Sequence, residues 1–203
     1  MAEGKKEKPA RADAQRNIQS LLDAAMEVFT TSGVDAPIRD IAEKAGVGVG
    51  TLYRHFPRRS DLILAVFRKE VDACAEASVI LAAQYEPGEA LDRWLHRFID
   101  FVAAKRGLSA ALHSGDPAYE SLPDYLMEHL APAVSGLIKE AAAAGDVRSD
   151  VRPVDLLMGI AHLCTPDGKG GITAESRRMV SLLIDGLRYK ACGERQAWSL
   201  PTE

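Results

Sequence analysis

The segment from residue 48 to residue 59 combines small, hydroxyl-bearing and basic side chains in a short stretch of chain. This mixture suits contact with DNA, because small residues let the backbone approach base edges while hydroxyl and cationic groups bind phosphate oxygens. We therefore expect a surface that binds double-stranded DNA and includes Thr51, Tyr53, Arg54 and His55.

Two short helices joined by a turn are predicted to hold these side chains. Residues 38–45 repeat apolar side chains at helical spacing, and Gly46 suits the left-handed position that often follows a helix. The next helix is too short to fold alone, and we expect Leu52 and Phe56 to face the core rather than DNA. Its opposite face can then enter a major groove.

Residues 37–56, PIRDIAEKAGVGVGTLYRHF, resemble the helix-turn-helix of the TetR (TetR/AcrR) family of transcriptional regulators. The signature of that family ends in a Thr-Leu-Tyr-x-His-Phe-like segment, and specific motifs carry the resemblance over residues 14 to about 70. The resemblance implies that Arg39 faces the DNA and that Tyr53, His55 and Arg59 bind phosphates. It also implies that the front of the second helix lies close to base edges, at Gly48, Val49, Gly50 and Thr51. Past residue 70 it rests on length and helix order.

Two positions depart from the family pattern. Arg58 stands where the family commonly has Ser or Thr before its fourth helix. Either this helix begins later, capped by Ser60, or Arg58 adds a phosphate contact. The chain also reads Ala36-Pro37-Ile38 where the family often has Thr, so we expect one phosphate-binding hydroxyl to be missing.

The charge of the chain is unevenly distributed along its 203 residues. The net charge of −4 argues against a protein that coats nucleic acid indiscriminately. Residues 1–70 hold 12 Lys or Arg against 10 Asp or Glu, whereas the remainder holds 13 against 19. A mildly basic front on an acidic body favours a protein that contacts DNA with one end.

The predicted fold class is all-α, with about nine helices, because the chain lacks the period-two alternation of half-buried strands. We expect a disordered arm at residues 1–12 and a three-helix DNA-binding domain at residues 13–60. A helical ligand-binding and dimerisation domain should follow at residues 61–192, and residues 193–203 should form a tail. Pro123 and Pro132 predict a broken start or a kink in a helix from about Tyr119 to Ala144.

Regulators of this family typically carry a helical domain that binds a small molecule and dimerises. An apolar pocket with a few polar groups would use aromatic, Met and His side chains, and a packed core is the competing interpretation. The candidates are Trp94, Phe98, Phe101, His113, Tyr125, Met158 and His162. We expect no cofactor and no metal, since the cysteines and histidines show no metal-ligand spacing. The identity of the small-molecule effector is not readable from the sequence.

The two predicted helices at 153–164 and 174–189 each carry an apolar stripe with small residues. Two such antiparallel helices can pair with their copies in a four-helix bundle, although packing within one chain is the alternative. The predicted homodimer interface consists of Val154, Leu157, Ala161, Met179, Leu182, Leu183 and Gly186.

Together these patterns indicate a ligand-responsive repressor that binds a palindromic operator as a homodimer. One alternative is a DNA-binding regulator that answers to a protein partner or to no effector. Another is a carrier or enzyme in the C-terminal region, which the absence of GxSxG and HExxH motifs disfavours. We expect no enzymatic activity. We also expect a cytoplasmic protein without membrane contact, because no apolar run approaches the roughly 18 residues that span a bilayer and the charged N-terminus lacks a signal-peptide core.

Overall fold

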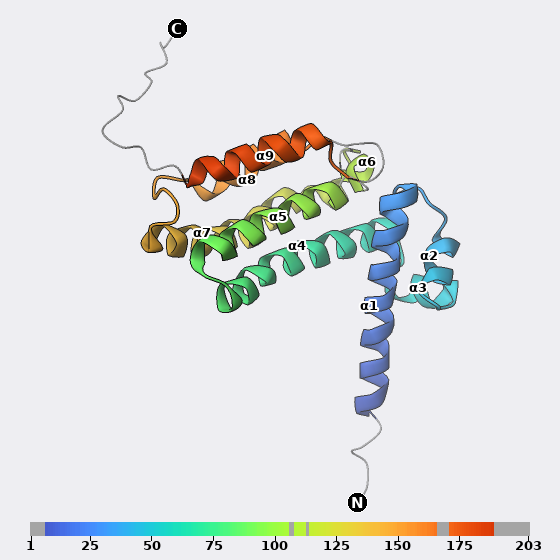
Figure 1. The fold of residues 1–203 in the computed structure, drawn as a ribbon. Coiled ribbons are helices and arrows are strands. Elements are labelled where there is room, and N and C mark those ends of the chain that lie inside the picture. Colours follow the sequence, from blue (N-terminus) through green and yellow to red (C-terminus); the bar gives the residue numbers. More distant parts are fainter. Residues whose placement is uncertain (1–6, 106–107, 113, 166–170, 189–203) are drawn as a thin grey trace, which may run out of the picture.

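The computed structural model describes residues 7–105, 108–112, 114–165 and 171–188 (Figure 1). The elements over these ranges are helices, which confirms the predicted all-α class. They are α1 (Glu7–Ser32), α2 (Ile38–Lys44), α3 (Val49–His55), α4 (Arg59–Gln84), α5 (Pro87–Lys105), α6 (Ser109–Leu112), the 3₁₀ turn η2 (Pro117–Tyr119), α7 (Leu122–Ala144), α8 (Pro153–Leu163) and α9 (Ala174–Leu187). No helix over these ranges is long and apolar enough to cross a membrane.

The N-terminal unit is built from α1, α2 and α3, with α1 packed on both α2 and α4. Leu21, Ala25 and Phe29 of α1 are fully buried and form the centre of this unit. Gly33 ends α1 in the left-handed conformation (φ 79°), which favours glycine. The helix begins at Glu7 and not near Asp13, so residues 7–12 are helical and were wrongly assigned to a disordered arm. The remaining residues of that arm lie outside the described ranges.

The turn between α2 and α3 follows the predicted pattern. Gly46 adopts a positive φ of 69°, and the backbone N–H of Val47 donates to the carbonyl of Ala42 (3.0 Å). Ile41 of α2 and Leu52 of α3 are fully buried, and Phe56 lies just after α3 with 9% of its surface exposed. These contacts confirm that Leu52 and Phe56 belong to the core, and they fix which face of α3 remains open.

The body of the molecule is a layered bundle in which α4, α5 and α7 pack on one another. In Figure 1, α4 and α5 run side by side, α8 and α9 lie on the far side of α5 from α4, and α1 stands across the end of α4. An aromatic stack fills the core between α4 and α5: Trp94 lies parallel to Phe98 (ring centroids 5.8 Å apart), and Phe101 continues the row beside Phe67. This packing makes α4 the element shared by the N-terminal unit and the body.

The segment before α7 has the broken start that its prolines predict. The 3₁₀ turn η2 ends at Tyr119, and α7 begins at Leu122 with Pro123 in its first turn. A proline fits there because its missing N–H would have no partner within the helix. Pro132 lies inside α7, which continues to Ala144 and ends on Gly145 in the left-handed conformation.

Candidate functional sites

The open face of α3 carries most of the residues predicted to contact DNA. Gly48, Gly50, Tyr53 and Arg54 are exposed, and 49% of the Tyr53 side chain is accessible. In addition, Val49, Thr51 and His55 are half-buried at the edges of this face. Arg39, near the start of α2, is also exposed. The structure thus gathers small, hydroxyl and basic groups on the short helix that follows the turn, as the sequence predicted. We call this set, with Arg39, the reading face.

Glycine at the front of α3 is not required by the packing of this chain. A Cβ atom built on Gly48 or Gly50 would meet nothing within 4 Å, and neither residue has a positive φ. Glycine inside a helix costs about 1 kcal/mol relative to alanine, so the fold alone gives no reason for Gly50. Close approach of another molecule to the backbone of α3 would explain a glycine at this position.

Arg58 precedes α4, and its guanidinium forms an ion pair with Asp61 (Nη2–Oδ1 2.7 Å). The Asp61 carboxylate also accepts the backbone N–H of Arg58 at 3.0 Å, so it caps the start of the helix. The hydrogen bond from Arg58 holds the pKa of the Asp61 carboxyl below its ordinary value. The helix therefore begins at Arg59, and the alternative of a later start capped by Ser60 is wrong. A phosphate contact by Arg58 stays a prediction.

Arg59 was expected to bind a phosphate, and its side chain instead folds back onto the N-terminal unit. Its two terminal nitrogens donate to the carbonyls of Val34 and Ala36, the second at 2.8 Å. These acceptors lie 25 and 23 residues earlier in the chain, so no local sequence signal pointed to them. In this structure Arg59 thus joins α4 to the loop between α1 and α2, and its contact with a phosphate stays a prediction.

The predicted effector residues fall into two groups. Trp94, Phe98 and Phe101 are buried in the aromatic stack, and the indole Nε1–H of Trp94 donates to the carbonyl of Cys74 (2.8 Å). By contrast, Met158 and His162 are exposed on α8, with 41% of the Met158 side chain accessible. The structure thus separates Met158 and His162 from the buried aromatic residues, and a shared role in ligand binding stays a prediction. His113 lies outside the described residues.

Tyr125 of α7 belongs to a polar group that links α7 to α4. Its hydroxyl donates to Asp72 Oδ1 (2.7 Å), and His129 stacks on its ring with centroids 4.0 Å apart. The guanidinium of Arg68 lies over the same ring at 5.2 Å. Burial and the bond to Asp72 raise the pKa of Tyr125 to about 12. Sequence reasoning missed Asp72 and Arg68, because nothing in α4 marks which of its charges meets α7.

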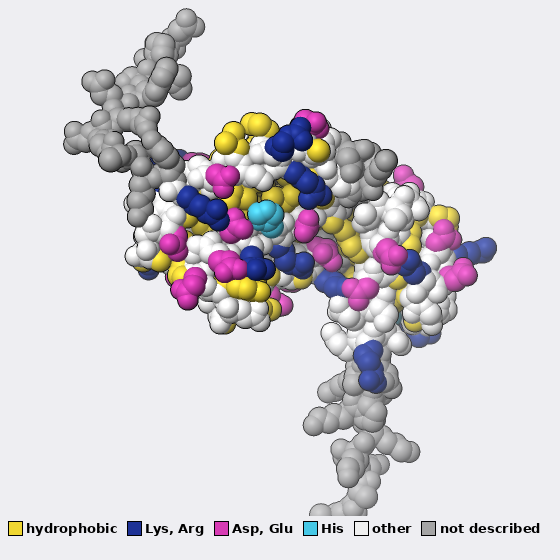
Figure 2. All heavy atoms as spheres, viewed as in Figure 1, with side chains coloured by type: hydrophobic (Ala, Val, Ile, Leu, Met, Phe, Trp, Pro, Cys, Tyr) yellow, Lys and Arg dark blue, Asp and Glu magenta, His cyan; other side chains and the backbone are white. Residues whose placement is uncertain are grey.

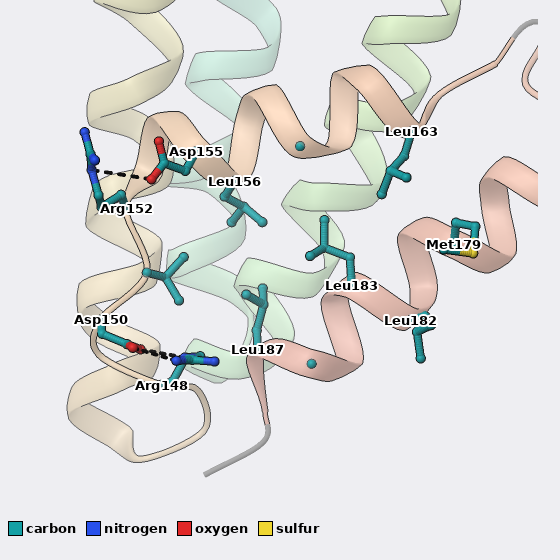
Figure 3. Close-up of a pocket in the computed structure, with 13 residues that line it drawn as sticks. Arg148, Asp150, Arg152, Asp155, Leu156, Leu163, Met179, Leu182, Leu183 and Leu187 are labelled. Atoms are coloured by element: carbon teal, nitrogen blue, oxygen red, sulfur yellow. Dashed lines mark hydrogen bonds and ion pairs between the residues drawn. The ribbon is translucent and has the colours of Figure 1, made fainter. Parts of the chain in front are cut away.

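An open groove of about 580 Å³ runs between α8, α9 and the segment that precedes α8 (Figure 3). Leu183 and Leu187 of α9 point toward α8, whereas Leu182 points away from it. At one end, Arg148 pairs with Asp150 (2.5 Å). The groove is thus mainly apolar, with charged pairs confined to its end.

The outer surfaces of α8 and α9 leave several large apolar side chains in the open. Val154, Met179 and Leu182 are exposed, and 65% of the Leu182 side chain is accessible. Hydrophobic side chains are also visible along the edge formed by α9 in Figure 2. Leu157 is fully buried within the chain, which corrects its assignment to a dimer interface. Leu183 and Gly186 line the groove and Ala161 is half-buried on α8, and the interface role of these three residues stays a prediction.

Comparisons with known proteins agree with this geometry. Residues 21–66 match the family model of bacterial regulatory proteins of the tetR family, and residues 86–189 match that of the SbtR-like transcriptional regulator C-terminal domain. The chain belongs to the TetR family of transcriptional regulators. It is similar to the crystal structure of a TetR transcriptional regulator from Streptomyces coelicolor, with 39% identity and a TM-score of 0.70 over 86% of this chain and 99% of that one.

Two further relatives extend the comparison. A TetR transcription regulatory protein from Mycobacterium vanbaalenii is 31% identical, with a TM-score of 0.70 over 89% of this chain and all of the other. An HTH-type transcriptional regulator of Staphylococcus aureus (strain USA300) is 40% identical over 63 residues, which is 30% of this chain and 34% of that protein's length. The match to the curated relatives thus covers about a third of their length.

Proposed function

We propose that this protein is a ligand-responsive repressor that binds a palindromic operator as a homodimer. The observation that carries the proposal is the reading face on α3, where exposed small and polar side chains stand opposite the buried Leu52. Because the family consists of DNA-binding regulators, this face is the part of the molecule best suited to a major groove. Its action on a chromosome would place the protein in the cytoplasm.

Two roles are assigned within the reading face. Residues 48–51 approach the base edges, where Thr51 offers a methyl and a hydroxyl group and the glycines allow close contact. Tyr53, Arg54 and His55 bind phosphates beside them, and Arg39 and Arg58 add cations at the rim. Phosphate contacts fix the position of the protein on the duplex, whereas base contacts select its sequence.

Dimerisation is assigned to α8 and α9. Their outward apolar side chains, Val154, Met179 and Leu182, are the kind that soluble proteins bury in an interface. A second copy related by a two-fold axis would cover them and place two copies of α3 on one face of DNA. Half-sites about 34–36 Å apart, or one turn of B-DNA, follow from that symmetry. Each protomer then reads the same half of a palindrome.

The effector is assigned to the body, which contains the aromatic stack and the hydrogen bond from Tyr125 of α7 to Asp72 of α4. Apolar walls with a few directed polar groups are typical of small-molecule sites. A ligand there can release DNA only through its different affinity for the bound and free shapes, and α4 is the element that contacts both units. Coupling of about 1–3 kcal/mol would weaken operator binding roughly 5- to 150-fold.

Affinity capture of fragmented genomic DNA by the purified protein tests the DNA-binding part, and we expect a few enriched fragments that share an inverted repeat. A thermal-shift screen of organic compounds, followed by release of the captured fragment, tests the effector part. Failure to enrich any fragment would overturn the proposal as a whole. Enrichment without any responsive compound would favour a regulator that answers to a protein partner or to no effector.

A further inference from the structure

Arg59 occupies the place where the N-terminal unit is joined to α4. Its guanidinium donates to the carbonyls of Val34 and Ala36, in the loop between α1 and α2. Both of these residues are only 5% exposed, so their backbone groups have limited access to water and require partners from the protein. The guanidinium supplies two of these partners from a single side chain.

The loop that Arg59 holds determines where α2 begins. Ala36 lies two residues before Ile38, the first residue of α2, and Pro37 caps that helix without a side-chain hydrogen bond. The position of α2 in turn sets that of α3, because the two helices pack through the buried Ile41 and Leu52. Holding the carbonyl of Ala36 therefore holds the reading face relative to α4.

Other charged contacts brace the same unit at different points. Lys69 of α4 pairs with Asp23 of α1, and Lys44 of α2 pairs with Glu27 of α1 (2.5 Å). These pairs fix α1 against its neighbours, but both are formed by exposed carboxylates that water screens. Arg59 differs from them because its half-buried side chain binds two backbone carbonyls of the loop directly before α2.

The same end of α4 also contacts the body. The 3₁₀ turn η2 packs against α4, and its Tyr119 is buried close to Arg59 and Asp61. Arg59 thus lies between the loop that carries the reading face and the segment that leads into α7. A guanidinium engaged on this side directs its N–H groups to carbonyls and not toward a phosphate.

From this geometry we infer that Arg59 is a positioning residue for DNA binding: it fixes the angle of the reading face on α4 and forms no phosphate contact. The inference rests on the proposed DNA-binding function. An arginine is required for this task because its planar fork binds two carbonyls at once, whereas a lysine ammonium is a single point charge. If Arg59 contacted a phosphate instead, a lysine at this position would retain most of the affinity for DNA.

Affinity for the operator as a function of salt, measured for the full-length protein, separates the two roles. Removing one phosphate contact lowers the slope of log K against log salt by about 0.9. We expect Arg59→Ala and Arg59→Lys each to weaken binding roughly tenfold while the slope stays at the wild-type value. Arg54→Ala, which removes an exposed arginine of α3, is the matched control. It should lower the slope by about 1.8, because the change occurs in both protomers of the dimer.

Half-site spacing gives a second readout that a general loss of stability does not change. Wild-type protein should lose affinity when one base pair is inserted between the half-sites. The Arg59 variants should discriminate less between the two spacings, because their reading faces are no longer held at one angle. Should Arg59→Ala fail to fold, Arg59→Lys carries both measurements.

Three outcomes would overturn the inference: a slope lowered by about 1.8 in Arg59→Ala and restored in Arg59→Lys, wild-type affinity in both variants, or unchanged discrimination of spacing. If the wild-type protein bound no operator, the proposed function would fail. The hold of Arg59 on the loop between α1 and α2 could still be tested by hydrogen exchange in the absence of DNA. Hydrogen exchange of the Ala36 and Asp40 amides should then rise in Arg59→Lys while the α1 core stays protected. Unchanged exchange of the Ala36 and Asp40 amides would contradict the role of Arg59 in holding this loop.

Discussion

Tyr53 is the most exposed aromatic side chain of the reading face, and its hydroxyl group is the part that a phosphate would use. Because about half of the side chain is accessible, its ring adds little to the core and its chemistry can be altered without loss of the fold. Arg59 shows the opposite case, in which a cation close to α3 is directed inward. The residue type alone does not distinguish these two roles.

Replacing Tyr53 with Phe should weaken operator binding roughly tenfold or more, because a hydrogen bond to a charged acceptor contributes about 1.5–3 kcal/mol. Fluorescence anisotropy with a labelled operator measures the change. Tyr85→Phe, at the far end of α4, is the matched control and should bind as the wild type does. Equal affinity in all three proteins would remove Tyr53 from the phosphate contacts.

Tyr125 should titrate far above an ordinary tyrosine. Burial and the hydrogen bond to Asp72 raise the pKa of Tyr125 to about 12, so its phenolate forms less readily in the folded state than in the unfolded chain. The stability that this bond contributes is therefore present below pH 10 and is lost as the pH rises toward 12. A difference titration at 295 nm between the wild type and Tyr125→Phe checks this, and a midpoint near pH 10 would contradict it.

At the scale of elements, the start of α5 depends on a close contact with the loop that follows α7. The backbone N–H of Gly88 donates to Asp146 Oδ2 (3.0 Å), and a Cβ atom on Gly88 would lie 2.8 Å from the Cβ of Asp146. No side chain larger than hydrogen fits there without moving Asp146. The glycine thus allows the loop to cap the helix.

Replacing Gly88 with Ala should lower the free energy of unfolding by about 1–3 kcal/mol, because the new methyl group displaces Asp146 and breaks the cap. Gly136→Ala is the matched control in α7, where a Cβ atom meets nothing within 4 Å. That change should raise stability by about 0.5–1 kcal/mol, since alanine favours a helix. Chemical denaturation measures both, and equal shifts of the same sign would refute the steric argument.

The two short helices and their core residues were predictable because the signals are local. Gly46 marks the turn, and Leu52 of α3 and Phe56 just after it recur at helical spacing. The sequence did not predict the inward direction of Arg59 or the hydrogen bond from Tyr125 to Asp72. Their partners come from distant segments that only the packing of the chain brings together. A stripe of apolar residues on a helix does not show which of them pack within the chain and which face a second copy. Leu157 was therefore assigned to the dimer interface although it is buried within the chain.

For the whole molecule, the exposed apolar side chains of α8 and α9 argue for a second copy. Leu182 is accessible in one protomer, so a change there should leave its fold intact. In a two-fold dimer the same change occurs twice at one interface, and each new charge would be buried without a partner. The oligomeric state is therefore sensitive to this position.

Replacing Leu182 with Arg should raise the dimer dissociation constant by more than about a hundredfold. Operator affinity should fall with it, since two half-sites no longer bind as one unit. Sedimentation velocity checks the state directly. Val79→Arg is the matched control, because Val79 is 73% exposed on α4, away from α8 and α9, and it should remain dimeric. A dimeric Leu182→Arg protein would locate the interface elsewhere.

The central claim is that the reading face of α3 selects a DNA sequence, and selection from a random pool of duplexes tests it most directly. The wild type should enrich an inverted repeat with half-sites about one helical turn apart. Thr51→Ala should enrich a repeat with relaxed preference at one position in each half-site and unchanged preference elsewhere. Enrichment of no sequence by the wild type, or of an identical motif by both proteins, would contradict the account.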